Sequence, residues 1–234
     1  MMRYWEIIEK FDLVPWWGEF LKSNPSLNIP YHNLQHTIYM VEDAYEGAMT
    51  EGLVPNENHP LLRAHLLAAI YHDWGHTGGV IHLNPKLRGT ETGPGISEAF
   101  PDSENIRIAL DKVHAMNALG FWPAGVSLDQ VFKGIQATEF PYNVPPENLS
   151  LSGRILRDAD FMTNWRQTML PHVMCGLAQE LGYSLREFLV GRRAFNEGME
   201  ACTDWGKRKR TVFLEECFAE IDLNIRALGK IPGA

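Results

Sequence analysis

The stretch "PLLRAHLLAAIYHDW", residues 60–74, opens with a proline and is apolar nearly all round. Proline is favoured in the first turn of a helix, where its missing N–H would have no partner anyway. A helix that is apolar on every side is buried among other elements. We therefore expect the central helix of an all-α fold here, with His72 and Asp73 buried at its polar end.

Helical periodicity continues on both sides of this segment. The other predicted helices cover 3–22 with a break near Pro15, 33–52, 103–118, 127–138 with Ser127 as cap, 151–181 with a break at Pro171, 184–202 with a Ser184–Glu187 capping box, and 211–228. We find no alternating strand pattern, internal repeat or low-complexity tract. The sequence therefore predicts one all-α domain spanning residues 1–234, built as a helical bundle.

Residues 77–102 do not fit a compact bundle, because they are rich in glycine and proline and have no hydrophobic period. Loops of this length are uncommon unless they are functional or disordered. The segment also follows His72 and Asp73 directly. We interpret it as a lid or substrate-binding loop, with a surface excursion as the alternative.

The composition excludes several classes of partner. The chain has 234 residues, 45% of them hydrophobic, and a net charge of −8. A protein that binds a nucleic acid polymer needs a basic face, and the one basic run, 206–210, is short. We interpret that run as a solvated helix flank and expect no nucleic acid polymer as partner.

Localisation follows from the cysteines and the apolar runs. The three cysteines form no C-x-x-C pair, which argues against a disulfide framework and favours a reducing cytoplasm. The first residues carry acids among their apolar side chains, unlike a signal peptide. No apolar run reaches membrane-spanning length, so we expect no membrane contact.

Four side chains from separate predicted helices form a candidate metal site. His36 lies on one helix, His72 and Asp73 at the end of a second, and Asp160 on a third. Facing helices of a bundle often build such sites in their core. Neutral imidazole with carboxylate suits Zn, Fe or Mn, and a carboxylate can bridge to a harder ion such as Mg. Asp160 also lies among apolar residues, where an unpaired carboxylate would be costly.

These motifs resemble a known family. The "H…HD…D" pattern is similar to that of HD-domain metal-dependent phosphohydrolases, and most similar to the catalytic domain of class I cyclic nucleotide phosphodiesterases. The resemblance covers roughly residues 31–164 and rests on "YHNLQH" at 31–36, "AAIYHDWGHTG" at 68–78, "SEN" at 103–105, "ATE" at 137–139 and "DAD" at 158–160. The family's "Q-x-x-F" base clamp is not found in the C-terminal third, so the base is left open.

The resemblance implies an HD-type bundle with a dinuclear metal site, and it implies a role for each matching residue. His36, His72, Asp73 and Asp160 would hold the first ion, Zn or else Fe or Mn. Asp73 would bridge to the second ion, Mg or Mn. His32 would be the general acid. The remaining matches, which would arrange water around the second ion, are His76, Glu104 and Thr138.

The expected function is metal-dependent hydrolysis of a phosphate ester in a small nucleotide, most of all a cyclic one. A hydroxide held between the two ions would attack phosphorus while His32 protonates the leaving oxygen. The alternatives are an HD-type nucleotidase, a non-catalytic nucleotide-binding module, and an HD-fold di-iron oxygenase. The oxygenase needs further imidazoles, for which the sequence offers His76, His82 and His114.

Two other polar residues receive structural interpretations. His65 lies seven positions before His72, on the same helical face, and is interpreted as a packed core histidine rather than a partner of the metal ligands. Asp158 is interpreted as a surface residue or a helix-dipole partner, because its neighbour Asp160 fits the motif.

Overall fold

The computed structural model describes residues 2–56, 59–77, 102–163, 166 and 172–229. These residues form helices and no strands, which confirms the predicted all-α class. The helices are α1 (Tyr4–Lys10), α2 (Val14–Ser23), α3 (Leu34–Thr50), α4 (Pro60–Tyr71), α6 (Ser103–Ala118), α7 (Leu128–Gln136), α8 (Leu151–Thr163), α9 (Ala178–Leu181), α10 (Leu185–Gly198) and α11 (Asp204–Leu228), with a 3₁₀ helix at Pro146–Asn148 and a π-helix at His172–Leu177.

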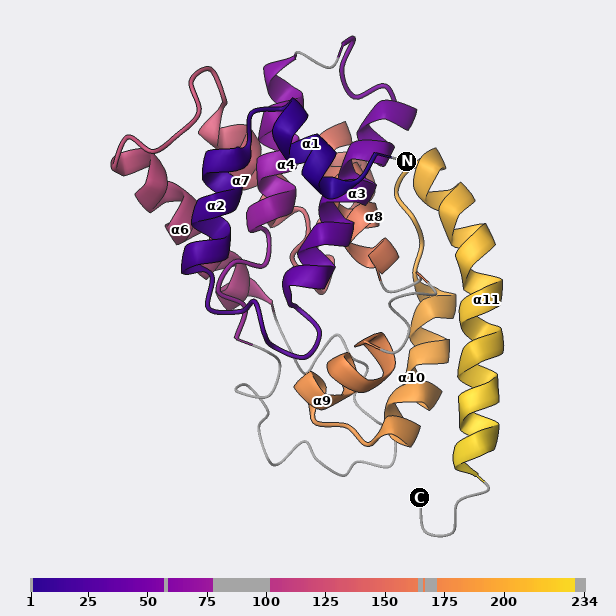
Figure 1. Cartoon of the computed structure of the whole chain (residues 1–234). Coiled ribbons are helices and arrows are strands. Elements are labelled where there is room, and N and C mark those ends of the chain that lie inside the picture. Colours follow the sequence, from indigo (N-terminus) through magenta and orange to yellow (C-terminus); the bar gives the residue numbers. More distant parts are fainter. Residues whose placement is uncertain (1, 57–58, 78–101, 164–165, 167–171, 230–234) are drawn as a thin grey trace.

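Helix α4 is the centre of the bundle. It begins with Pro60 in its first turn, and every residue from Ala64 to Tyr71 is buried. It packs against α3 on one side and α7 on another, and α3 in turn packs against α8. Figure 1 shows α4 surrounded by these helices and by α1 and α2. The prediction of a central buried helix is confirmed.

Side-chain caps define where several helices begin, as the sequence indicated. Ser127 Oγ accepts a hydrogen bond from the Gln130 amide at the start of α7. In α10, Ser184 Oγ accepts from the Glu187 amide, and the Glu187 carboxylate accepts from the Ser184 amide. Each pair satisfies amides that the first helical turn leaves unpaired.

The first predicted helix, residues 3–22, is two helices with a break near Pro15, as predicted. The break lies at Phe11–Leu13, where Asp12 adopts a φ of +53°. Pro15 instead occupies the first turn of α2, a position that tolerates proline because the amide there needs no helical acceptor. The proline therefore marks the start of a helix rather than the end of one.

The last helix begins at Asp204, seven residues before the predicted start. Thr203 caps it by accepting from the Gly206 amide at 2.9 Å. The basic run 206–210 thus lies inside α11, where Lys209 pairs with Glu46 at 2.6 Å. Apolar periodicity cannot detect a first turn that is held by a cap and by ion pairs.

Helix α11 runs along one side of the bundle beside α8 and α10 (Figure 1). The π-helix, α9 and α10 precede it and form a second layer below α3 and α8 in that view. The predicted break at Pro171 and residues 78–101 of the predicted lid loop lie outside the described residues.

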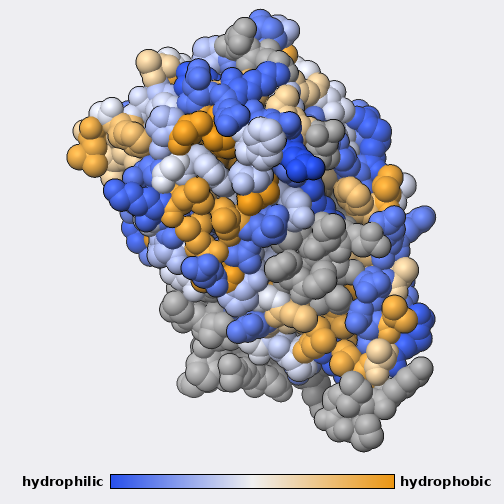
Figure 2. Space-filling view, viewed as in Figure 1, coloured by the Kyte–Doolittle hydropathy of each residue, from blue (hydrophilic) through white to orange (hydrophobic). Residues whose placement is uncertain are grey.

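On the face shown in Figure 2, hydrophobic residues lie in separate groups among hydrophilic ones. Such a mixture is ordinary for a folded chain. Within the described residues, no helix is both long and apolar enough to cross a membrane. The three cysteines, Cys175, Cys202 and Cys217, are free thiols.

Candidate metal centre

The start of α3 positions His36. Asn33 is the N-cap residue, and its side-chain oxygen accepts from the amides of Gln35 at 2.9 Å and His36 at 3.3 Å. This cap fixes the first turn, so that His36 points inward and is completely buried. The sequence "YHNLQH" therefore contains its own cap as well as its ligand.

The end of α4 positions His72 and Asp73. His72 is the C-cap residue, and its Nδ1 lies 2.9 Å from the carbonyl oxygen of Ala69 one turn earlier. That contact orients the ring so that Nε2 points away from α4. Asp73 follows directly and is 9% exposed. An apolar helix thus ends in two polar side chains that face the interior.

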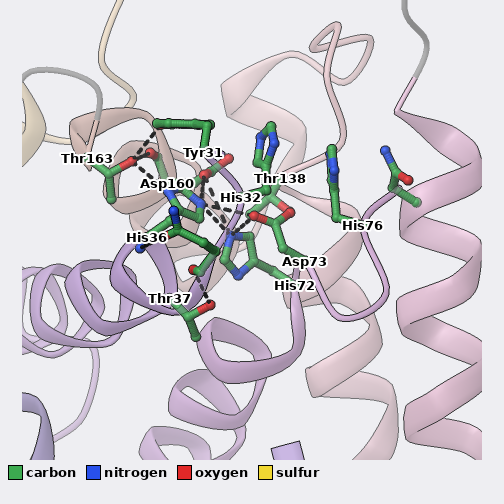
Figure 3. A network of polar contacts seen from close by, with 12 residues as sticks. Tyr31, His32, His36, Thr37, His72, Asp73, His76, Thr138, Asp160 and Thr163 are labelled. Carbon is green, nitrogen blue, oxygen red and sulfur yellow. Dashed lines mark hydrogen bonds and ion pairs between the residues drawn. The ribbon is translucent and has the colours of Figure 1, made fainter. Parts of the chain in front are cut away.

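Four donor atoms meet at one point. His36 Nε2 and His72 Nε2 are 3.1 Å apart, and each lies 3.0 Å from Asp73 Oδ2. Asp160 Oδ1, from α8, lies 3.2 Å from the first nitrogen and 3.6 Å from the second. Figure 3 shows both imidazoles directed toward the two carboxylates. The structure thus brings together the four residues that the sequence singled out as ligands.

Hydrogen bonds on the far side of each ring identify which nitrogen faces this point. Thr163 Oγ donates to the Asp160 carbonyl at 2.8 Å, so it must accept from His36 Nδ1, 3.0 Å away. The Ala69 carbonyl can only accept, so His72 Nδ1 also carries a proton. In the neutral rings both Nε2 lone pairs then point at the carboxylates, as metal-ligating histidines do.

The charge balance at this point favours a cation. Burial alone would raise the pKa of Asp160, but His36 and His72 outweigh it and lower the pKa to about 2. The pKa of His72 is raised well above its usual value, because Asp73 and Asp160 outweigh the opposing effect of burial. Asp73 Oδ2 is buried and receives no hydrogen bond. The donor set fits a divalent ion, which would replace the extra proton.

A second cluster lies beside the first and contains His32. The Nδ1 of His32 is 2.6 Å from Glu180 Oε2, and the amides of His32 and Tyr31 donate to Oε1 of the same carboxylate. Burial lowers the pKa of His32, but the charge and hydrogen bond of Glu180 raise it to about 9. The pKa of Glu180 falls to about 2 despite its burial. The two side chains therefore form an ion pair.

A close approach of two backbones makes this ion pair possible. Glu180 lies on α9, directly after the π-helix, and both pack against the start of α3. A Cβ atom on Gly176 would collide with the carbonyl of Pro30. Glycine at this position therefore lets the two segments approach closely enough for Glu180 to reach Tyr31 and His32.

His76 lies against His32, as expected for residues around a shared site. The two rings stack with centroids 3.7 Å apart (Figure 3). Burial and the charge of His32 lower the pKa of His76 to about 3. The turn that returns His76 to the site passes through Gly75, at a φ of +77°, where a Cβ would lie 2.6 Å from Ile108.

Asp102, rather than Glu104, is the acid that approaches this cluster. Its Oδ1 lies 3.7 Å from His76 Nε2, and burial together with Asp73 raises its pKa to about 7. The Glu104 side chain is 47% exposed and pairs with the exposed Arg107 on the outer face of α6. The structure does not bring Glu104 to the site, because the helix turns it away from His76.

The other residues singled out in the sequence have clear positions. Thr138 is buried at the end of α7, where its hydroxyl donates to the Ile135 carbonyl, and Figure 3 includes it in the network. His65 is a core histidine, as predicted, with Nδ1 2.8 Å from Ser152 Oγ and Nε2 3.0 Å from the Ala44 carbonyl.

Two further predictions concern residues that do not join the site. Asp158 is not on the surface but fits the other alternative, a helix-dipole partner: it is buried at the N-terminus of α11 and accepts from the amides of Cys202 and Thr203 and from the Thr203 hydroxyl. His114, an imidazole that the oxygenase alternative needs, is exposed on α6, and His82 lies outside the described residues.

Sequence reasoning missed Glu180 and Asp102. The signal for Glu180 was an acid among apolar residues in "GLAQELGY", which marks a buried carboxylate that needs a partner. No spacing rule connects it to His32, 148 residues away. Asp102 lies two residues before the acid that the motif favours, and only the turn of α6 decides which of the two faces inward.

No protein-family model, curated protein or solved structure matches this chain.

Proposed function

We propose that the chain is a metal-dependent phosphohydrolase and that it cleaves a phosphodiester in a small nucleotide, most of all a cyclic one. The observation that carries the proposal is the convergence of two imidazole nitrogens and two carboxylate oxygens, all within 4.8 Å of one another. Beside them lies an acid–base pair, His32 and Glu180. Together they supply what phosphate ester hydrolysis needs: sites for cations and a proton donor.

Each ligand has an expected part. His36, His72, Asp73 and Asp160 would hold a first divalent ion, Zn, Fe or Mn. Asp73 would also serve a second ion, Mg or Mn, and the further candidates to bind that ion or its water are His76, Thr138 and Asp102. Such ions lower the pKa of bound water and neutralise the oxygens of the phosphoryl group. The nucleophile is then water, and no side chain needs to attack phosphorus.

His32 would protonate the leaving oxygen. Its Nδ1–H donates to Glu180, which leaves the Nε2 proton to be delivered to substrate. The side chain is 21% exposed, whereas the side chains of His36 and His72 are only 1% exposed. A substrate can therefore reach His32 without displacing a ligand. Glu180 stabilises the imidazolium and fixes its orientation.

A hydrolysis panel tests this proposal. Cyclic mononucleotides, cyclic dinucleotides and nucleoside monophosphates would each be incubated with purified protein and Mn, Mg or Zn. We expect release of a monoester from a diester, abolished by a chelator and restored by added ion. Cleavage of monophosphates alone would favour a nucleotidase. Tight binding of a nucleotide without turnover under every condition would contradict the enzyme and favour a binding module.

A further inference from the structure

Arg192 on α10 is a buried cation without a partner in the described part of the chain. The residue is 4% exposed, and its Nε and Nη2 atoms are buried without a hydrogen bond. No described carboxylate forms an ion pair with it. The other buried arginine of the site region, Arg157, is different, because it donates to the carbonyls of Ala137 and Val144.

An unpaired buried charge destabilises the folded protein, so its presence indicates a functional role. Burial lowers the pKa of Arg192 below the usual arginine value. Aromatic rings lie over this charge: the guanidinium carbon lies 5.0 Å from the Phe195 centroid and 6.0 Å from that of Phe188. Ring faces hold the guanidinium in place but supply no hydrogen-bond acceptors.

Arg192 lies near Tyr31 and near the candidate metal ligands. Its guanidinium lies over Phe188, which packs in one buried cluster with Tyr31, and over Phe195, whose ring contacts that of Phe161, the neighbour of Asp160. The Tyr31 hydroxyl is 3.1 Å from Thr163 Oγ, which accepts from His36. The charges of Arg192 and Asp160 both act on this hydroxyl, in opposite directions. Tyr142 also interacts electrostatically with both Asp160 and Arg192. Arg192 thus supplies a buried positive charge close to the candidate metal ligands.

We propose that Arg192 binds a second phosphate group of the substrate, one that is not cleaved. The inference rests on the proposed function, because it assigns the substrate class of that same site. A guanidinium forms paired hydrogen bonds with phosphate oxygens, which would satisfy the buried N–H groups that have no partner now. The preferred substrates are then phosphodiesters with a further phosphate, such as a cyclic dinucleotide or a 5′-phosphorylated dinucleotide, rather than cyclic mononucleotides.

A matched pair of substrates tests the assignment. The dinucleotide pApA carries a terminal phosphate, and ApA has the same scissile diester without it. Wild-type protein should prefer pApA in kcat/KM by about 10- to 100-fold, the range for a hydrogen-bonded charge. Arg192→Gln should abolish the preference. The control Arg193→Gln should retain it, because Arg193 is 40% exposed and pairs with Asp222 and Glu197. An undiminished preference in Arg192→Gln would overturn the proposal.

A stability measurement keeps the two proposals separable. Arg192→Met removes the buried charge and keeps most of the volume, so the melting temperature without ligand should rise by about 2–8 °C. Inorganic pyrophosphate should raise the melting temperature of wild-type protein and of Arg193→Gln, but not of Arg192→Met. If neither dinucleotide is cleaved yet this pattern is found, the proposed function fails and the anion site stands. If Arg192→Met melts at a lower temperature than wild type, and pyrophosphate raises the melting temperature of wild type, Arg193→Gln and Arg192→Met equally, the anion-site proposal is wrong.

Discussion

At the scale of single residues, the partner of His32 gives a selective prediction. Glu180→Gln keeps the shape of the side chain but removes the charge that raises the pKa of His32. Hydrolysis of a nucleotide ester, whose leaving alkoxide needs a proton, should fall by about 10²-fold. Bis-p-nitrophenyl phosphate has a stable leaving group, so its hydrolysis should change little. The ratio of the two rates is the measurement, because a partial loss of folded protein cancels in it.

The control for that variant is Glu187→Gln, on the exposed start of α10, which should alter neither rate. Metal content measured by elemental analysis should be equal in wild type, Glu180→Gln and Glu187→Gln. Equal slowing of both substrates by Glu180→Gln would show that Glu180 shapes the site without acting through a proton.

A second prediction at this scale concerns Asp102 and Glu104. The motif and the geometry disagree about which of these two acids would bind the second ion. The resemblance assigns Glu104 to the second ion, whereas in the structure it is Asp102 that lies beside His76, with 3.7 Å between Oδ1 and Nε2. Glu104→Ala should keep its metal content and its activity within about twofold, as exposed positions usually do. Asp102→Asn should bind the second ion more weakly. Titration with Mn²⁺, followed by electron paramagnetic resonance, measures this directly, and the reverse order of effects would restore the motif assignment.

At the scale of elements, His65 ties α4 to its two neighbours. It contacts the Ala44 carbonyl on α3 and the Ser152 hydroxyl on α8, and burial lowers its pKa from 6.5 to about 4. As the pH falls below 6.5, His65 becomes protonated in the unfolded chain but stays neutral in the folded chain. The free energy of unfolding therefore decreases between pH 6.5 and about 4. The difference is on the order of 3 kcal/mol.

Urea denaturation at pH 7.5 and at pH 5 measures this contribution. His65→Gln should be less stable than wild type at pH 7.5, and its stability should fall less on going to pH 5. An unchanged pH dependence in the variant would mean that other groups titrate over this range and that His65 does not.

Asp158 fixes where α11 begins. It accepts three hydrogen bonds of 2.7–2.8 Å from Cys202 and Thr203. Asp158→Ala leaves these donors without their partner and should lower the free energy of unfolding by about 2–4 kcal/mol. Asp204→Ala is the control, because that side chain is 79% exposed and should change stability by less than about 1 kcal/mol. Thermal unfolding followed by circular dichroism measures the change in stability of both variants.

The sequence predicted those helices well that carry an apolar period and a side-chain cap, such as α4, α7 and the start of α10. It failed where the decisive contact comes from elsewhere in the chain. The first turn of α11 is charged, and its start depends on Asp158, 45 residues earlier. The break near Pro15 was predicted, but not its exact position at Asp12, whose positive φ has no signal as strong as a glycine or proline would give.

In the candidate site, too, the residues with a local sequence signal were predicted and those that depend on distant contacts were not. His36, His72, Asp73 and Asp160 were predictable as a group, because they are metal-ligating side chains on three predicted helices and match one known motif. Glu180, Asp102 and Arg192 were not predicted. Their roles depend on which face of a helix meets a neighbour far away in sequence, and a single sequence carries no such information.

At the scale of the whole molecule, the C-terminal third completes the site rather than standing apart from it. The ligands come from α3, α4 and α8, but Glu180 comes from α9 and Arg192 from α10. These two residues contact or approach the segment around Tyr31 and His32. The bundle thus supplies the four candidate metal ligands, and the later helices supply the two charged residues that the proposals assign to the substrate.

The most direct test of the central claim is the number of divalent ions bound per chain. Wild-type protein, stripped and reconstituted with Mn²⁺, should hold two ions after gel filtration. Asp73→Ala should lose both, because Asp73 serves both positions, whereas Asp111→Ala, on the exposed face of α6, should keep two. Wild-type protein without bound ions, or Asp73→Ala with a full complement, would contradict the account.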